Sequence, residues 1–144
     1  MSTESRGASI SIADFCAALY CAYAPADAFE PSGTAQITFT ARSTENGHDL
    51  RYRVAFDGVT DLTARHEGSY SSALRGPLEL SVIEVEGQPG HWRVWFNPWY
   101  LHEIEFRCTE IRLNGASVRG TGRHLQDELP TRTPAVPSFP EGAA

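Results

Sequence analysis

Lysine is absent from this chain, and all 12 of its Lys+Arg residues are arginine. The simpler explanation is the codon bias of a GC-rich genome, and the alternative is that planar guanidinium groups were selected for interfaces. The absence also excludes a phosphate-binding P-loop, which needs a lysine. The run Gly120-Thr121-Gly122-Arg123 could form an anion-binding nest, but close backbone approach or a twist within a strand explains it better.

Cysteine is scarce, and the three residues are Cys16, Cys21 and Cys108. On a helix, Cys16 and Cys21 would point in different directions, so they cannot easily form a disulfide. An odd count without regular spacing predicts reduced, buried thiols and a cytoplasmic location. The first residues lack a basic region followed by a long apolar stretch, so we expect no signal peptide. No apolar run is long enough to predict a membrane span.

Positive charge is also in deficit, since the formal net charge is −6 and the pI is near 5.3. This balance argues against a nucleic-acid backbone as the main partner. The hydrophobic share of 41% and the charged share of 21% are typical of a globular protein. A chain of 144 residues is long enough for one domain with an ordinary core.

One helical period is present, near the start of the chain. Ser11 and Asp14 resemble a capping box. Pro25 should stop the helix at or before residue 24. Between these limits, four apolar residues recur at helical spacing: Ile12, Phe15, Leu19 and Tyr23. The pattern predicts an amphipathic helix over residues 11–23, whose aromatic-rich stripe lies on a sheet.

Two Asn-Gly pairs predict β-hairpins, because both central residues of a type I′ turn need positive φ. A turn at Asn114-Gly115 sets Leu113 opposite Ala116 and Ile111 opposite Val118. A turn at Asn46-Gly47 sets Phe39 opposite Val54, with one unfavourable pair, Arg42 opposite Arg51. The apolar residues of each hairpin then share one face.

Three irregularities complicate the strand pattern. Alternation slips at Thr109-Glu110, which predicts a β-bulge there. The segment 59–65 has the wrong parity for a plain hairpin at Asp57-Gly58, so either a bulge intervenes or it pairs elsewhere. The segment 78–86 is predicted to be a strand joined by a four-residue loop to 91–97, with Glu84 opposite Arg93. Pro98 should end ladder pairing, and this hairpin should be central in its sheet.

The predicted fold is α+β, with an N-terminal amphipathic helix packed on an antiparallel sheet of about six or seven strands. We expect a flexible N-terminus over residues 1–10, a single domain over 11–129 and a mobile surface loop over 66–77. Four of the chain's nine prolines lie in residues 130–144, which predicts a disordered tail that contributes nothing to the core. The alternative for this tail is a proline-rich motif for a partner.

The best functional signal is a cluster of aromatic residues within positions 92–100. Alternation prevents them from sharing one buried face, so Trp92 and Phe96 are expected in the core. The others are expected on a binding surface, unless the helix and loops cover them. The candidate binding residues are Trp95, Trp99, Tyr100, Arg93, Glu103 and Glu105.

Catalytic motifs are absent from the sequence, which lacks GxSxG, HExxH and zinc-ribbon spacing. A metal site built from His91, His102 and His124 would need ligands from three strands to converge. Glu103 and Glu105 share a strand face and could divide acid and base roles, but pairing with arginines explains them better. We therefore expect no catalytic residue, metal or cofactor.

These observations favour a small, acidic, cytoplasmic, non-enzymatic protein that docks a protein partner with a basic surface. Its charge would suit an inhibitor or an immunity-type protein that neutralises a toxin. One alternative is a small-molecule or carbohydrate binder that uses Trp95, Trp99 and Tyr100 as a stacking platform. The other is a metal-assisted enzyme that uses the histidines.

Overall fold

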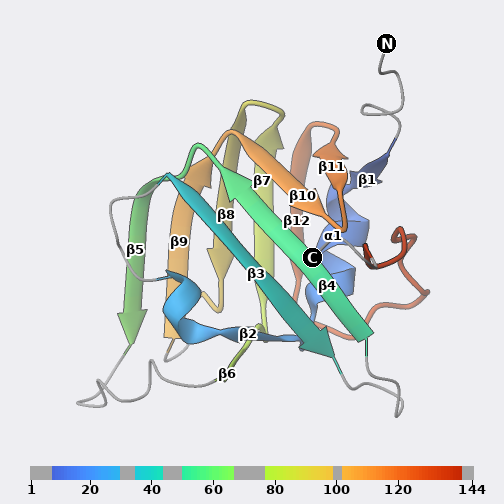
Figure 1. Cartoon of the computed structure of the whole chain (residues 1–144), viewed down its shortest axis with the longest axis horizontal. Helices are drawn as coiled ribbons and strands as arrows, with labels where there is room; N and C mark the ends of the chain where they lie inside the picture. The colour runs from blue at the N-terminus through green and yellow to red at the C-terminus, as the bar shows by residue number, and fades with distance from the viewer. Residues whose placement is uncertain (1–7, 30–34, 44–49, 67–76, 99–101, 141–144) are drawn as a thin grey trace.

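The computed structural model describes residues 8–29, 35–43, 50–66, 77–98 and 102–140, with only the backbone described at residues 26, 65, 66 and 102. Within these residues the chain forms two facing sheets, one of seven strands and one of five (Figure 1). All neighbouring strands are antiparallel except β1 and β11, which run parallel.

The spatial order of the strands differs from their order in the chain. The seven-stranded sheet contains, from edge to edge, β1 (Ser9–Ser11), β11 (Ala116–Arg119), β10 (Glu110–Leu113), β4 (Leu50–Asp57), β3 (Gln36–Ser43), β2 (Tyr23–Pro25) and β6 (Pro77–Glu79). The five-stranded sheet contains β12 (Gly122–Gln126), β7 (Ile83–Gln88), β8 (His91–Phe96), β9 (His102–Cys108) and β5 (Thr60–His66). The 3-10 helix η2 (Ala26–Phe29) follows β2.

The prediction of a single sheet is wrong, because the described strands divide between two. Alternation states which side chains share a face of a strand, but not which sheet the strand joins. The inward faces of both sheets bury one apolar core. Phe56 of β4 lies near its centre, with its ring centroid 4.9 Å from that of Phe106 and 6.3 Å from that of Phe96. This ring therefore links the two sheets.

The helix α1 (Ile12–Leu19) begins as predicted, since Ser11 Oγ accepts a hydrogen bond of 3.0 Å from the backbone N–H of Asp14. It ends earlier than the predicted residue 23. Cys21 takes φ 65°, and the chain then turns into β2. Tyr23 thereby leaves the predicted apolar stripe and is 43% exposed.

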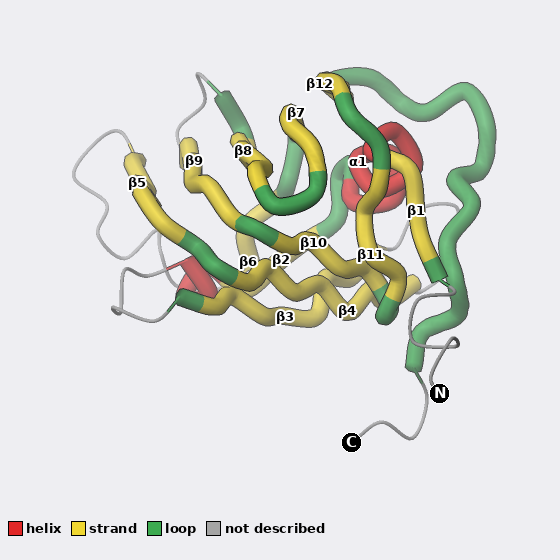
Figure 2. The backbone as a smooth tube through the Cα atoms, turned by 90° about the horizontal axis from the view of Figure 1, so that it is seen from above, coloured by secondary structure: helices red, strands yellow, loops and turns green. Residues whose placement is uncertain are grey.

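The position of α1 also differs from the prediction. The helix lies between β12 of one sheet and β1 of the other, and not on the face of a single sheet (Figure 2). It contacts β7 and β12 as well as β1 and β11. Phe15 extends from it to Phe56, with ring centroids 6.3 Å apart. The helix therefore closes one side of the space between the sheets.

Both Asn-Gly predictions are confirmed in their registers. Asn114 and Gly115 have φ 50° and 85°, and Leu113 lies opposite Ala116. The β3–β4 ladder sets Phe39 opposite Val54 and includes the expected Arg42–Arg51 pair. The turn at residues 46–47 itself lies outside the described residues.

The predicted bulge near Thr109 is instead a change of sheet. β9 ends at Cys108 in the five-stranded sheet, and β10 begins at Glu110 in the seven-stranded sheet. Crossing to the facing sheet reverses which side of the strand is interior. A slip of one residue therefore keeps both Phe106 and Ile111 buried.

The segment after Asp57-Gly58 changes sheet as well, which explains its parity. β5 pairs with β9, and its register shifts between Thr60 and Thr63. Gly58 has φ 66°, and a Cβ there would lie 2.3 Å from Oγ1 of Thr109. Because the two crossings pack so closely, only glycine fits at this position.

The β7–β8 register differs from the prediction by two residues. Glu86, and not Glu84, lies opposite Arg93, because the strands extend to Gln88 and His91 and leave a two-residue turn. A shift of two keeps every side chain on its expected face. The hairpin is central, as predicted, since β8 is the middle strand of the five described. The predicted strand over 78–86 is divided between β6 and β7, which belong to different sheets.

The chain ends contact the domain more than the sequence indicates. Ser9–Ser11 form β1. Val136 packs against the core, and Asn114 Nδ2 donates a 2.9 Å hydrogen bond to the carbonyl of Pro137. The predicted surface loop falls mostly on residues 67–76, outside the described residues. The division into domain and tail stays a prediction.

Candidate functional site

The candidate site is the outer face of the five-stranded sheet. In β8, the even-numbered residues are buried toward the core, whereas Arg93 and Trp95 are partly exposed on the other side. The β7–β8 and β8–β9 ladders place outward-facing residues of both neighbours beside them. We call this surface the Arg93 face; it comprises Glu84, Glu86, Arg93, Trp95, Glu103, Glu105 and Arg123.

Arg93 connects three carboxylates across this face. Its Nε lies 2.6 Å from Glu105, and its Nη1 lies 2.8 Å from Glu86 and 3.2 Å from Glu84. Burial opposes the charge, but hydrogen bonds and charge interactions with Glu105, Glu86 and Glu84 together outweigh it, so the pKa of Arg93 is raised. The guanidinium stays charged and is held in one orientation.

Glu84 is the buried member of the Arg93 face, with only 4% of its side chain exposed. It binds Arg93 with one oxygen and Arg123 of β12 with the other. A buried carboxylate is tolerated when both oxygens have charged donors, and removing one donor is costly. This pairing therefore ties β12 to β8 across β7.

Trp95 is oriented by two neighbours. Its Nε1 donates a 2.6 Å hydrogen bond to Glu103, and the guanidinium carbon of Arg93 lies 4.7 Å from its ring centroid. A cation stacked on the indole face and a hydrogen bond at its edge restrict the ring together. The partly exposed indole is thus part of a preorganised surface.

Alternation brings four of the predicted binding residues together on this face: Arg93, Trp95, Glu103 and Glu105. Trp99 and Tyr100 lie outside the described residues. The prediction omits Glu84, Glu86 and Arg123. A signal for the glutamates is the pattern Glu84-x-Glu86, which repeats that of Glu103-x-Glu105 on the next but one strand.

The geometry does not favour acid–base catalysis by Glu103 and Glu105. Glu103 accepts from the Trp95 indole, and Glu105 accepts from Arg93. Each carboxylate is therefore already engaged by a donor of a neighbouring side chain. The two carboxylates are more simply the partners that orient Arg93 and Trp95.

The proposed histidine site does not assemble within the described part of the chain, where no group of three or more His, Cys, Asp or Glu could hold a metal ion. His91 shares the parity of Arg93, whereas His124 lies opposite the inward-facing Val85. His124 Nε2 is 2.8 Å from Gln126 Oε1. The side chain of His102 lies outside the described residues.

The glycines at 120 and 122 belong to another crossing between the sheets. They have φ 108° and 144°, and they join β11 of one sheet to β12 of the other. The predicted twist within a strand is therefore a change of sheet. Backbone freedom, and not anion binding, explains why glycine occurs here.

No family model, curated protein or solved structure matches this chain. No helix in the described ranges is long and apolar enough to span a membrane. The Arg93 face is therefore interpreted from its own geometry.

The three cysteines are thiols, as predicted, with Cys16 and Cys108 buried and Cys21 partly exposed. Burial raises the pKa of Cys108 to about 12, and the charge of Asp57 adds to the shift. Burial, followed by the charge of Glu84, also raises the pKa of Cys16 well above its ordinary range. Both buried thiols therefore stay protonated in the folded protein at moderately alkaline pH.

This protonation predicts that stability falls above about pH 9. The unfolded chain releases these protons above its thiol pKa of about 8.5, whereas the folded chain keeps them until about pH 12 for Cys108. The free energy of unfolding should fall by about 1.4 kcal/mol per pH unit for each such thiol. Urea denaturation of Cys108→Ala between pH 9 and 10 should show a slope shallower by that amount. Cys21→Ala is the matched control, and a Cys108→Ala slope equal to that of the wild type would contradict the assignment.

Proposed function

We propose that this chain is a non-enzymatic binding protein whose Arg93 face docks a protein partner of basic character, in the manner of an inhibitor. The observation that carries the proposal is that Arg93 binds three carboxylates and stacks on Trp95. This arrangement fixes an aromatic ring and a set of charges on an outer sheet face before any partner binds.

Two physical arguments support a protein partner. Tryptophan and arginine are the residue types most enriched at interface hot spots. Side chains that are already restrained lose less entropy when a partner covers them. The charge of the chain agrees, since its formal net charge is −6. Such a balance steers basic surfaces toward it.

A carbohydrate platform is less well supported. Stacking of a sugar needs an open aromatic face, and the Arg93 guanidinium lies over the Trp95 ring at 4.7 Å. The other two residues of the proposed platform, Trp99 and Tyr100, lie outside the described residues.

The proposed location is a reducing compartment such as the cytoplasm. The thiol state of Cys16, Cys21 and Cys108 supports it.

Replacing Trp95 with alanine tests the proposal. Wild-type chain, Trp95→Ala and Arg107→Ala are immobilised and exposed to cell extract, and the recovered proteins are compared. A partner docked on the Arg93 face should be retained by the wild type and lost from Trp95→Ala. Its Kd, measured with the purified partner, should rise about 30-fold or more, which corresponds to about 2 kcal/mol for a hot-spot residue.

Arg107→Ala is the matched control, because Arg107 lies on the same outer face but its side chain is 64% exposed. Removing this exposed charge should change the salt dependence of association more than the affinity. Urea denaturation must show that Trp95→Ala is folded. Undiminished binding of the partner by folded Trp95→Ala would overturn the proposal.

A further inference from the structure

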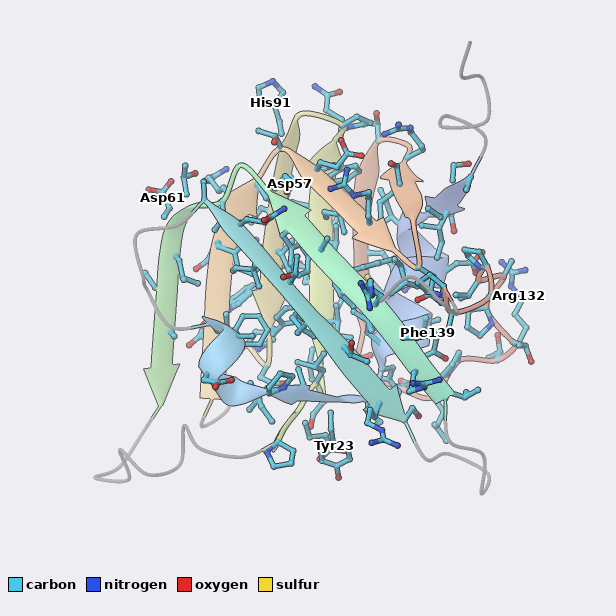
Figure 3. The ribbon with its side chains drawn as sticks, viewed as in Figure 1. Tyr23, Asp57, Asp61, His91, Arg132 and Phe139 are labelled. Carbon is cyan, nitrogen blue, oxygen red and sulfur yellow. The ribbon has the colours of Figure 1, made fainter. Side chains whose placement is uncertain are left out.

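The second surface of interest lies on the opposite side of α1 from the core. After β12 the chain passes around the outside of α1 (Figure 2), and Arg132 and Phe139 lie on that side of the molecule (Figure 3). We call residues 129–140 the C-terminal strap. Its sequence contains the pattern Pro134-x-x-Pro137-x-Phe139.

Specific side chains of the domain hold this pattern. Asn114 Nδ2 donates a 2.9 Å hydrogen bond to the carbonyl of Pro137. The guanidinium carbons of Arg51 and Arg53 lie 4.4 Å and 5.9 Å from the ring centroid of Phe139. Val136, which lies between Pro134 and Pro137 in the sequence, packs against the core. The domain thus binds a carbonyl, an apolar side chain and an aromatic ring of one extended segment.

The strap does not fill the space that it covers. A cavity of about 750 Å³ lies between it and the domain. Ala17 and Tyr20 of α1, together with Ser43 and Tyr52 of the β3–β4 hairpin, line the domain side. Volumes of this order are typical of ligand sites. The groove is therefore larger than its present occupant needs.

The contacts of the strap are also of kinds that contribute little at exposed positions. Arg132 lies 3.9 Å from Asp14 with 78% of its side chain exposed, so this ion pair is strongly screened. The hydrogen bond from Asn114 and the two arginine contacts involve only Pro137 and Phe139. The entropy cost of ordering the backbone, by contrast, opposes docking at every residue of the strap. Proline reduces that opposition without removing it. The strap is therefore a segment that can be displaced.

We propose that this groove is a docking site for an extended peptide of a partner protein with the pattern Pro-x-x-Pro-x-Phe, and that the C-terminal strap occupies it as a built-in competitor. Proline-rich segments are preorganised and present carbonyls that bond to no neighbour of their own, which suits recognition by Asn114. The two arginines select the aromatic residue and favour an acidic group after it. This site is independent of the Arg93 face.

The test uses full-length chains and a fluorescent peptide with the sequence of residues 130–144. Phe139→Ala loosens the strap in cis, so fluorescence anisotropy should show the peptide binding to this variant at least about tenfold more tightly than to the wild type. Adding Arg51→Ala to Phe139→Ala should reverse the gain. Adding Asn114→Asp to Phe139→Ala should also reverse the gain, because aspartate keeps the turn but cannot donate to the Pro137 carbonyl. A peptide in which alanine replaces Pro134, Pro137 and Phe139 should not bind.

Three results would overturn the proposal. The first is a peptide affinity of Phe139→Ala no higher than that of the wild type, and the second is equal binding of the alanine-substituted peptide. The third is a concentration-dependent wild-type dimer in sedimentation that Phe139→Ala abolishes, because the occupant would then be the strap of a second copy. Trp95→Ala should leave peptide binding unchanged, so failure here is distinguishable from failure of the Arg93 face.

Discussion

Replacing Phe56 with alanine is expected to lower the free energy of unfolding by about 3–5 kcal/mol. Its ring contacts those of Phe106 and Phe96 in the five-stranded sheet, Phe39 on the neighbouring strand and Phe15 on α1. Truncation leaves a cavity bordered by four other elements, β3, β8, β9 and α1, and a sandwich of two sheets cannot collapse locally to fill it. The loss is a large share of the total stability of an ordinary domain, about 5–15 kcal/mol.

Urea denaturation followed by tryptophan fluorescence measures this loss. Tyr23→Ala is the matched control, because Tyr23 is also aromatic and on the same sheet but is 43% exposed. It should change the free energy of unfolding by no more than about 0.5 kcal/mol. A loss below about 1 kcal/mol for Phe56→Ala would contradict the two-sheet core, since a ring at its centre cannot be removed so cheaply.

The second large effect is expected at Asn97, which is 3% exposed and has φ 53°. Its Oδ1 accepts hydrogen bonds of 2.8 Å and 3.2 Å from the backbone N–H groups of Ser81 and Val82. Its Nδ2 donates a 2.9 Å bond to the carbonyl of Glu79. Ser81 and Val82 belong to the crossing from β6 to β7 and lie outside both printed ladders, whereas Glu79 is the last residue of β6, opposite Tyr23. One side chain therefore replaces the missing sheet partners.

Asn97→Ala should cost about 3–4 kcal/mol, because it removes these bonds at buried backbone groups and places alanine at positive φ. Asn97→Gly removes the same bonds but tolerates positive φ, so it should cost about 1 kcal/mol less. Urea denaturation of both variants separates the hydrogen bonds from the backbone strain. Equal stabilities of Asn97→Gly and the wild type would show that the bonds contribute nothing and that the crossing is held otherwise.

The candidate site was predictable from the sequence to the extent that it depends on alternation. Arg93 and Trp95 share a face because they are two residues apart on one strand, and so do Glu103 and Glu105. The link from Arg93 to Glu86 and Glu84 depends on the β7–β8 register. The register predicted from the sequence differs from the observed one by two residues. Arg123 was not predictable, because β12 leaves the sheet of its hairpin neighbour β11 and joins β7.

The segments that local chemistry determines are those that the sequence alone predicts. Asn114 and Gly115 form their turn because positive φ is a property of the residues themselves. Ser11 caps α1 because its hydroxyl reaches an amide three residues away. The β3–β4 register follows from one turn and two apolar faces of matching parity, which outweigh the Arg42–Arg51 pair.

The tertiary structure alone decided which sheet each strand joins. Successive strands change sheet five times: at Gly58, between β5 and β6, at residues 80–82, at Thr109 and at Gly120. The crossings at Gly58 and Thr109 alter the parity of the strand pattern, and the crossing at residues 80–82 interrupts a run that would otherwise be one strand. The alternation of apolar and polar residues is the same in either sheet, because it indicates only that one face of the strand is buried. The choice depends on Phe56, Phe96 and Phe106 meeting in one core, and these contacts join residues far apart in the chain.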